Sequence, residues 1–217
     1  MPIDLSDILA DIPTPIVEVP AFDFQPATVP FASPKGTDIF AEQKRKAWHE
    51  ENKIEARCDF TRKVRLTRRG GVFFMSLWQK SVFGRTLTDI KSDDTMVDKF
   101  ATEIVGLIHE IIGHQLCDGS WCVVTTPKRR HLVKNFSTRV SEQMSKLLNI
   151  PFYEDVAICR SKQRINAVYD LNILPKEPNI ICFDDFVTTG STLGAMDRLL
   201  KPLGKNVIYF TGINNIL

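Results

Sequence analysis

The stretch that decides the fold is Ile180-Ile181-Cys182-Phe183-Asp184-Asp185-Phe186-Val187-Thr188-Thr189-Gly190-Ser191-Thr192-Leu193, near the C-terminus of the 217-residue chain. Its first four residues are apolar and predict a buried strand over residues 179–183. Two carboxylates end this run, and a loop of hydroxyl-bearing residues around one glycine follows them. From Leu193 onward, apolar residues recur at helical spacing. The stretch therefore predicts a strand, an acidic pair, a polar loop and a helix in direct succession.

The predicted loop has the chemistry of an anion site. The first N–H groups of a helix have no partner within the helix, and the helix dipole favours a negative charge there. Gly190 permits a positive φ and a close approach of the main chain to a phosphate group. Four hydroxyl donors surround it: Thr188, Thr189, Ser191 and Thr192. An ordinary Ser/Thr helix cap accounts for one hydroxyl, but not for four around a glycine.

The acidic pair points to a sugar as the rest of the ligand. Asp184 and Asp185 follow the apolar run, and open α/β sheets bind ligands at the carboxyl ends of their strands. Carboxylates accept hydrogen bonds well from paired hydroxyls, which a ribose ring carries on one face. We therefore expect a site for a phosphorylated sugar at this edge of the sheet.

Composition narrows the class of protein. The chain is 43% hydrophobic, enough for a core, and its net charge of +2 gives only weak support for a nucleic-acid partner. The start Met1-Pro2-Ile3-Asp4 lacks the basic segment of a signal peptide, and no apolar run has transmembrane length, so we expect a cytoplasmic protein. The five cysteines include no C-x-x-C pair, which argues against a disulfide framework or a zinc knuckle.

The N-terminal third divides into two predicted regions. Residues 1–35 hold seven of the twelve prolines and predict an extended Pro-rich arm, with a disordered tail as the alternative. Residues 36–92 predict a hood-like region with a helix over 38–55 and a hairpin around Gly70-Gly71. The basic residues of this hairpin invite a nucleic-acid hypothesis, but acids nearby favour a solvated face.

Residues 93–217 predict the core domain, an α/β fold with a doubly wound, mostly parallel sheet. Helices are expected over 94–113 and 136–148, and strands over 121–124, 151–158, 179–183 and 207–211. Alternating strands and helices favour right-handed parallel crossovers. The first and second of these strands run into basic loops, around residues 127–131 and 160–164, which are candidate anion sites at the sheet's carboxyl edge.

The central stretch resembles the phosphoribosyl-pyrophosphate (PRPP) loop of type I phosphoribosyltransferases, which has an apolar strand, two acids, two variable residues and then a Thr/Gly/Ser-rich turn. Residues from about 83 onward are similar to the ComF-like, competence-associated branch of that family. Phe83-Gly84, Ile90-Lys91, Pro127-Lys128-Arg129-Arg130 and Lys134-Asn135-Phe136-Ser137 match its segments loosely or in part. The N-terminal zinc knuckle of that branch is missing from this chain.

The resemblance implies roles for individual residues. The 5′-phosphate is expected at Thr188, Thr189, Gly190, Ser191 and Thr192, and the pyrophosphate at Thr126, Lys128, Arg129 and Arg160. Catalytic roles are implied for Asp184, Asp185, Lys162 and Arg164. The two aspartates are also expected to hold Mg²⁺, mainly through water, because Mg²⁺ keeps much of its hydration shell.

Two functions follow from the resemblance. One is the transfer of a phosphoribosyl group from PRPP to a nitrogenous base with release of pyrophosphate. The alternative is a non-catalytic PRPP-binding regulatory or accessory protein, with a role in competence, DNA uptake or a mobile element. A homodimer is possible in either case, and no membrane partner is expected.

Overall fold

The computed structural model describes residues 56–114, 116, 118–128, 134–160 and 167–215. These residues all belong to one compact unit, Ala47–Leu217. The predicted Pro-rich arm and the predicted helix over 38–55 lie outside the described residues. The same holds for three predicted site residues: Arg129, Lys162 and Arg164.

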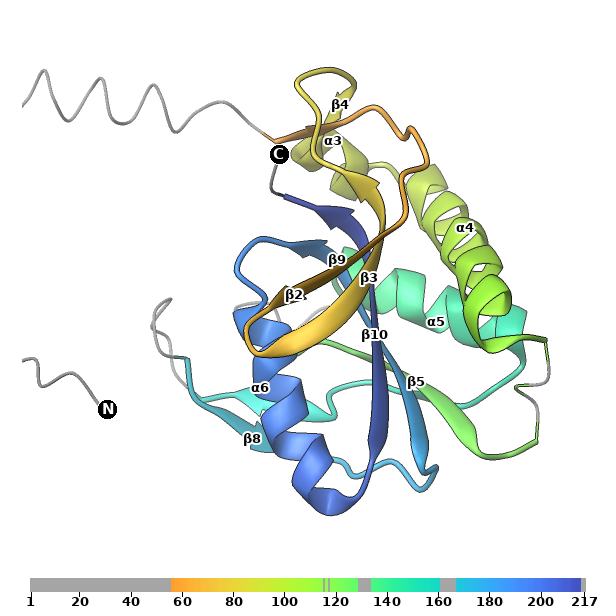
Figure 1. Ribbon diagram of the computed structural model, residues 1–217, viewed down its shortest axis with the longest axis vertical. Helices are drawn as coiled ribbons and strands as arrows, with labels where there is room; N and C mark the ends of the chain where they lie inside the picture. Colours follow the sequence, from red (N-terminus) through yellow and green to blue (C-terminus); the bar gives the residue numbers. More distant parts are fainter. Residues whose placement is uncertain (1–55, 115, 117, 129–133, 161–166, 216–217) are drawn as a thin grey trace, which may run out of the picture. The chain divides into compact units, whose positions relative to one another are not determined.

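A six-stranded sheet forms the centre of the described part (Figure 1). Its strands, in spatial order, are β2 (Arg65–Arg69), β3 (Val72–Gln79), β10 (Asn206–Asn214), β9 (Asn179–Val187), β5 (Trp121–Thr125) and β6 (Phe152–Tyr153). Only β2 and β3 pair antiparallel, and all other neighbours in the sheet run parallel. The predicted α/β fold with a mostly parallel sheet is confirmed.

Within the described residues, four α-helices accompany the sheet: α3 (Leu87–Ser92), α4 (Thr95–Ile112), α5 (Phe136–Leu148) and α6 (Ser191–Leu200). A short 3₁₀ turn, Lys201–Leu203, follows α6. Helices α4 and α5 cover one face of the sheet and α6 covers the other (Figure 1). Their apolar residues recur every three or four positions, so that the apolar face of each helix packs against the strands. No helix in the described ranges is long and apolar enough to cross a membrane.

The core on the α4–α5 face contains an aromatic cluster around Phe100. Its ring lies 4.6 Å from that of Trp78 and 5.1 Å from that of Phe136, between centroids. Phe60 meets both Trp78 and Phe100 edge to face. Such clusters bury large apolar areas, and this one ties β3, α4 and α5 into one packed layer.

The hairpin around Gly70-Gly71 forms as predicted, but it is part of the core sheet rather than of a region ahead of it. Strand β3 pairs parallel with β10, from Phe74 opposite Tyr209 to Gln79 opposite Asn214. Alternation of apolar and polar residues identifies a strand, but it does not identify the strand with which it pairs. The partner here comes from the far end of the chain, so the sequence pattern could not reveal the pairing.

Two other predicted strands have different bounds. The predicted strand over 151–158 is two elements: β6 in the main sheet and β7 (Ala157–Cys159), which pairs antiparallel with β8 (Tyr169–Leu171) in a small separate sheet. Asp155, at φ 55°, turns the chain between them. The predicted strand over 179–183 extends to Val187, because β10 continues alongside it and pairs Thr211 with Asp184.

The remaining described strands are two short ones, β1 (Arg57–Cys58) and β4 (Arg85–Thr86), which pair antiparallel with each other. They precede α3, whose N-cap Thr86 accepts a hydrogen bond from the N–H of Asp89. A Ser or Thr in this position satisfies one of the helix's unpaired N–H groups. Because Thr86 is both the end of β4 and the N-cap of α3, the pairing of β4 with β1 holds the start of α3 in place. This helix carries Lys91.

Candidate functional site

A cleft of about 960 Å³ opens at the carboxyl ends of β5 and β9. Residues from α3, from the segment after β5, from the first turn of α5 and from the β9–α6 connection line it. They are Lys91, Thr126, Pro127, Lys134, Asn135, Phe136, Ser137, Arg139 and all nine residues from Asp184 to Thr192. All five residues predicted for the 5′-phosphate, and both predicted acids, therefore share one cleft with Thr126.

The loop between β9 and α6 has the predicted conformation. Gly190 is the N-cap of α6 and has φ 73°, in the left-handed region that glycine adopts without steric cost. The hydroxyl of Thr189 accepts a hydrogen bond from the N–H of Ser191 at 3.3 Å and donates to the Ser191 hydroxyl at 3.1 Å. The loop thus presents a helix N-terminus and several hydroxyls to the cleft, an arrangement suited to an anion.

Gly190 has a second reason to lack a side chain. The sequence argument concerned only the approach of the main chain to a phosphate. In the structure, a Cβ at Gly190 would also lie 2.9 Å from backbone atoms of Arg69 in the hairpin. Both the positive φ and this contact make a larger residue unfavourable.

The acidic pair is held in place by two neighbours. Thr126 donates its hydroxyl hydrogen to Asp184 Oδ1 at 3.0 Å. The ammonium of Lys91 lies 2.8 Å from Asp185 Oδ2. Partial burial alone would lower the pKa of Lys91, but the charge and hydrogen bond of Asp185, with the charge of Asp184, outweigh it and raise the pKa. Lys91 is therefore a cation beside the acidic pair at neutral pH.

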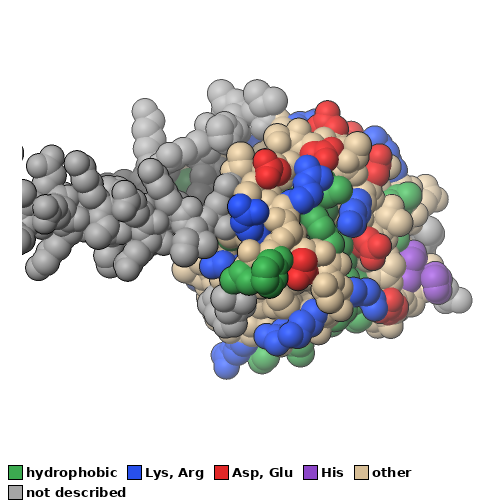
Figure 2. All heavy atoms as spheres, turned by 90° about the horizontal axis from the view of Figure 1, so that it is seen from above, with side chains coloured by type: hydrophobic (Ala, Val, Ile, Leu, Met, Phe, Trp, Pro, Cys, Tyr) green, Lys and Arg blue, Asp and Glu red, His purple; other side chains and the backbone are tan. Residues whose placement is uncertain are grey.

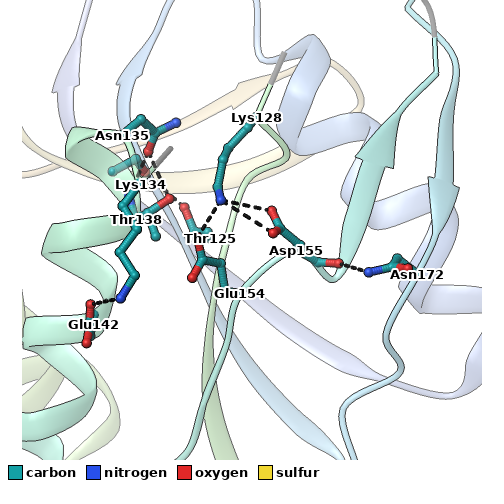
Figure 3. A network of polar contacts seen from close by, with 10 residues as sticks. Thr125, Lys128, Lys134, Asn135, Thr138, Glu142, Glu154, Asp155 and Asn172 are labelled. Carbon is teal, nitrogen blue, oxygen red and sulfur yellow. Dashed lines mark hydrogen bonds and ion pairs between the residues drawn. The ribbon is translucent and has the colours of Figure 1, made fainter. Parts of the chain in front are cut away.

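Two predicted pyrophosphate ligands do not line this cleft. Lys128 points toward the turn after β6, where its ammonium pairs with Glu154 and lies 3.2 Å from Asp155 Oδ1 (Figure 3). Its side chain is only 8% exposed. Burial alone would lower the pKa of Lys128, but the hydrogen bonds that its ammonium donates to Glu154 and Asp155 outweigh it and raise the pKa. Arg160 pairs with Asp170 beside the small β7–β8 sheet.

Sequence reasoning missed several cationic and polar residues of the cleft. Lys91 comes from α3, Lys134 from the segment just before α5, and Arg139 from the first turn of α5. Lys134 also pairs with Glu142 at 2.7 Å, as Figure 3 shows, and Asn135 accepts the N–H of Thr138 at 2.8 Å as the cap of α5. The segment 134–137 carried a signal, its partial match to the family. Ile90-Lys91 also matched the family loosely, but that match gave Lys91 no role in the site, and Arg139 carried no signal, because only the packing of α3 and α5 brings both side chains to the cleft.

The surface around this end of the molecule does not segregate charge by sign. Seen from above, acidic and basic side chains are interspersed (Figure 2). The charge relevant to a ligand is therefore the local set inside the cleft rather than a broad patch. Among the described residues that line it, the cleft combines two carboxylates with three cations, from Lys91, Lys134 and Arg139. This set suits a ligand with both hydroxyl and anionic groups.

The cleft fits a metal ion only if the ligand shares in its coordination. Among the described residues, no three side chains of His, Cys, Asp or Glu gather closely enough to hold a metal by themselves. Asp184 and Asp185 each already engage one neighbour, Thr126 and Lys91 respectively. A hard cation such as Mg²⁺ needs few protein oxygens when phosphate oxygens and water complete its shell, and two carboxylates fit that pattern.

The fold and the cleft define an α/β protein with a mostly parallel sheet and a glycine-containing, hydroxyl-rich loop at the carboxyl edge of that sheet. No protein-family model and no curated protein sequence matches the chain.

Solved structures similar to it are phosphoribosyltransferases. They include an adenine phosphoribosyltransferase (14% identity, TM-score 0.44, covering 70% of this chain and 84% of that chain). Another is the Saccharomyces cerevisiae adenine phosphoribosyltransferase complexed with D-2,5-dideoxy-2,5-imino-altritol 1,6-bisphosphate and adenine (14% identity, TM-score 0.43, covering 78% of this chain and 89% of that chain). A third is the orotate phosphoribosyltransferase of Aeropyrum pernix (14% identity, TM-score 0.38, covering 75% of this chain and 75% of that chain). The sequence identities and TM-scores of these three matches are low.

Proposed function

We propose that this protein is a type I phosphoribosyltransferase that binds PRPP and transfers its phosphoribosyl group to a nitrogenous base, with release of pyrophosphate. One observation carries the proposal: the acidic pair Asp184–Asp185 and the loop 188–192 line the same cleft, with Gly190 in the left-handed conformation at the start of α6. A phosphate site and a pair of carboxylates that can accept hydrogen bonds from hydroxyls, both in one cleft, suit the phosphate and the ring hydroxyls of a ribose 5-phosphate group.

The loop would bind the 5′-phosphate. The N-terminal end of α6, the helix dipole and the loop hydroxyls all favour a dianion there. Gly190 leaves room for the main chain to approach the phosphate oxygens. This part of the site gives affinity for the portion of PRPP that does not change during the reaction.

The acidic pair would hold the ribose hydroxyls. The contacts with Thr126 and Lys91 fix the carboxylates before any ligand binds, and such preorganisation is the main way in which a protein stabilises developing charge. The cations of the cleft offset the repulsion between the carboxylates and the phosphate groups. For the pyrophosphate we propose Thr126 and the segment that follows it, including Arg129. Lys162 and Arg164 stay predictions, since they lie outside the described residues.

The reaction needs no nucleophile from the protein. The bond between ribose C1 and the pyrophosphate oxygen breaks, and its electron pair leaves with pyrophosphate. A nitrogen of the base forms the new bond to C1 with its lone pair and releases its proton to solvent. Positive charge that develops at C1 and the ring oxygen is stabilised by the nearby carboxylates, and the main task of the chain is positioning.

Mg²⁺, brought with PRPP, would neutralise pyrophosphate oxygens, with Asp184 and Asp185 as its protein partners, mainly through water. From the motif resemblance we also propose a ComF-like protein in the cytoplasm. A homodimer remains a prediction.

The test is the release of pyrophosphate from PRPP across a panel of purine and pyrimidine bases, beside calorimetry with PRPP alone. The double variant Asp184→Asn/Asp185→Asn should lose PRPP binding with only a small change in melting temperature, because asparagine keeps the size of aspartate and both side chains line the cleft rather than the apolar core. Asp118→Asn is the control, since Asp118 is exposed and does not line the cleft. Absence of PRPP binding by the unmodified protein would refute the proposal, and binding without turnover on any base would support the non-catalytic alternative.

A further inference from the structure

The turn of the β2–β3 hairpin lies directly against the loop 188–192, called the anion loop from here on. A Cβ on Gly70 would sit 2.2 Å from the carbonyl oxygen of Gly190, and a Cβ on Gly194 would sit 2.2 Å from that of Gly70. Real Cβ contacts are never so short, so the two segments pack main chain against main chain. Three glycines, at the turn, in the loop and in the first turns of α6, make this approach possible.

Arg69, just before this turn, links the hairpin to the loop a second time. Its guanidinium Nη1 donates a hydrogen bond to the carbonyl oxygen of Thr188 at 3.0 Å. Its own backbone atoms lie 2.9 Å from the position that a Cβ on Gly190 would occupy. Arg69 therefore contacts both ends of the segment 188–190.

Holding the Thr188 carbonyl also orients a donor of the loop. The peptide bond is planar, and the described residues contain no cis peptide. The N–H of Thr189 therefore points opposite to the carbonyl that Arg69 holds. Because Thr189 lines the cleft and Arg69 does not, any effect of Arg69 on a bound anion passes through the loop.

We propose that Arg69 is a positioning residue of the anion site and that the hairpin turn Arg69–Gly70 forms its supporting wall. The ligand side of this inference rests on the proposed function, since the anion is taken to be a phosphate monoester. The support of the loop by Arg69 rests on the contacts alone.

The neighbouring Arg68 provides a matched control. Its guanidinium lies over the ring of Phe73, 5.4 Å from the centroid. Successive residues of a strand point to opposite faces of the sheet, so Arg68 has the same charge and nearly the same place in the chain but no bond to the loop. A difference between equivalent changes at 68 and 69 isolates the contact with Thr188.

The experiment titrates ribose 5-phosphate and ribose against the unmodified protein, Arg69→Met, Arg68→Met and Arg69→Lys. The Arg69–Thr188 hydrogen bond is exposed and supports the loop rather than contacting the ligand, so its loss in Arg69→Met should weaken ribose 5-phosphate binding by up to about tenfold. Ribose binding and the melting temperature should change no more than in Arg68→Met. Arg69→Lys should recover part of the loss, because it keeps a charged donor.

Amide hydrogen exchange over residues 188–192 gives a second readout that needs no ligand. Exchange should be faster in Arg69→Met than in the unmodified protein, and unchanged in Arg68→Met. Equal exchange in all three, or equal loss of ribose 5-phosphate affinity at positions 68 and 69, would overturn the inference. If the unmodified protein fails to bind ribose 5-phosphate, the proposed function is wrong, and the exchange experiment alone decides the role of Arg69.

Discussion

Replacing Gly194 by alanine should destabilise the protein, against the usual effect of that change in a helix. Gly194 lies inside α6, and alanine at an ordinary helical position is more favourable than glycine by about 1 kcal/mol. The new Cβ, however, would meet the carbonyl oxygen of Gly70 at 2.2 Å. Ordinary contact begins at 3.4 Å, so helix and hairpin must separate by roughly 1.2 Å.

The expected magnitude follows from two opposing contributions. Overpacking of this kind costs about 1–3 kcal/mol, which exceeds the helix-propensity gain of about 1 kcal/mol. We expect net destabilisation of up to about 2 kcal/mol and a melting temperature lower by roughly 2–8 °C. Because the displaced atoms belong to the wall of the anion loop, ribose 5-phosphate binding should also weaken.

Gly106→Ala is the matched control. Gly106 lies inside α4, is exposed, and has no atom within 4 Å of an added Cβ. That variant should gain about 0.5–1 kcal/mol from helix propensity alone. Urea denaturation followed by circular dichroism measures both variants. Equal stabilisation by the two alanines would refute the claimed contact between α6 and the hairpin.

Three further predictions concern charge and burial. Lys91→Met should weaken PRPP binding by up to about fivefold, measured by calorimetry, because it removes a half-exposed cation from the cleft; Lys176→Met, outside the cleft, should not. Hydrogen bonds from Thr95 and Arg85 lower the pKa of Asp93 to about 2. The Asp93 carboxylate should therefore stabilise the fold above pH 4, and this stabilisation should be lost as the pH falls from 4 to 2. The free energies of unfolding of the unmodified protein and of Asp93→Asn, measured in acid titrations, should become equal over that range. Burial raises the pKa of Cys58 to about 11 and of Cys122 to about 12. When the folded protein is alkylated at pH 8, peptide mapping should therefore find both thiols unmodified. Rapid labelling of either thiol would contradict its burial.

The sequence by itself determined the fold class and the central part of the candidate site. Apolar runs and helical periods are local patterns, and each of the predicted core strands at 121–124, 179–183 and 207–211 lies within a strand of the structure. The acids, the loop and the start of α6 are consecutive in the chain, so their proximity needed no tertiary information. Thr126 was also predictable at the same sheet edge, because parallel strands end together.

Tertiary structure decided which side chains complete that site. Lys128 follows a strand end, as Thr126 does, yet it turns to the acids after β6, because a buried ammonium is stable only beside opposite charge. Lys91 and Arg69 belong to segments far from the loop in sequence, and only the pairing of β3 with β10 and the packing of α3 place them there. Local propensity carries no information about such contacts, since they depend on which elements become neighbours after the sheet has formed.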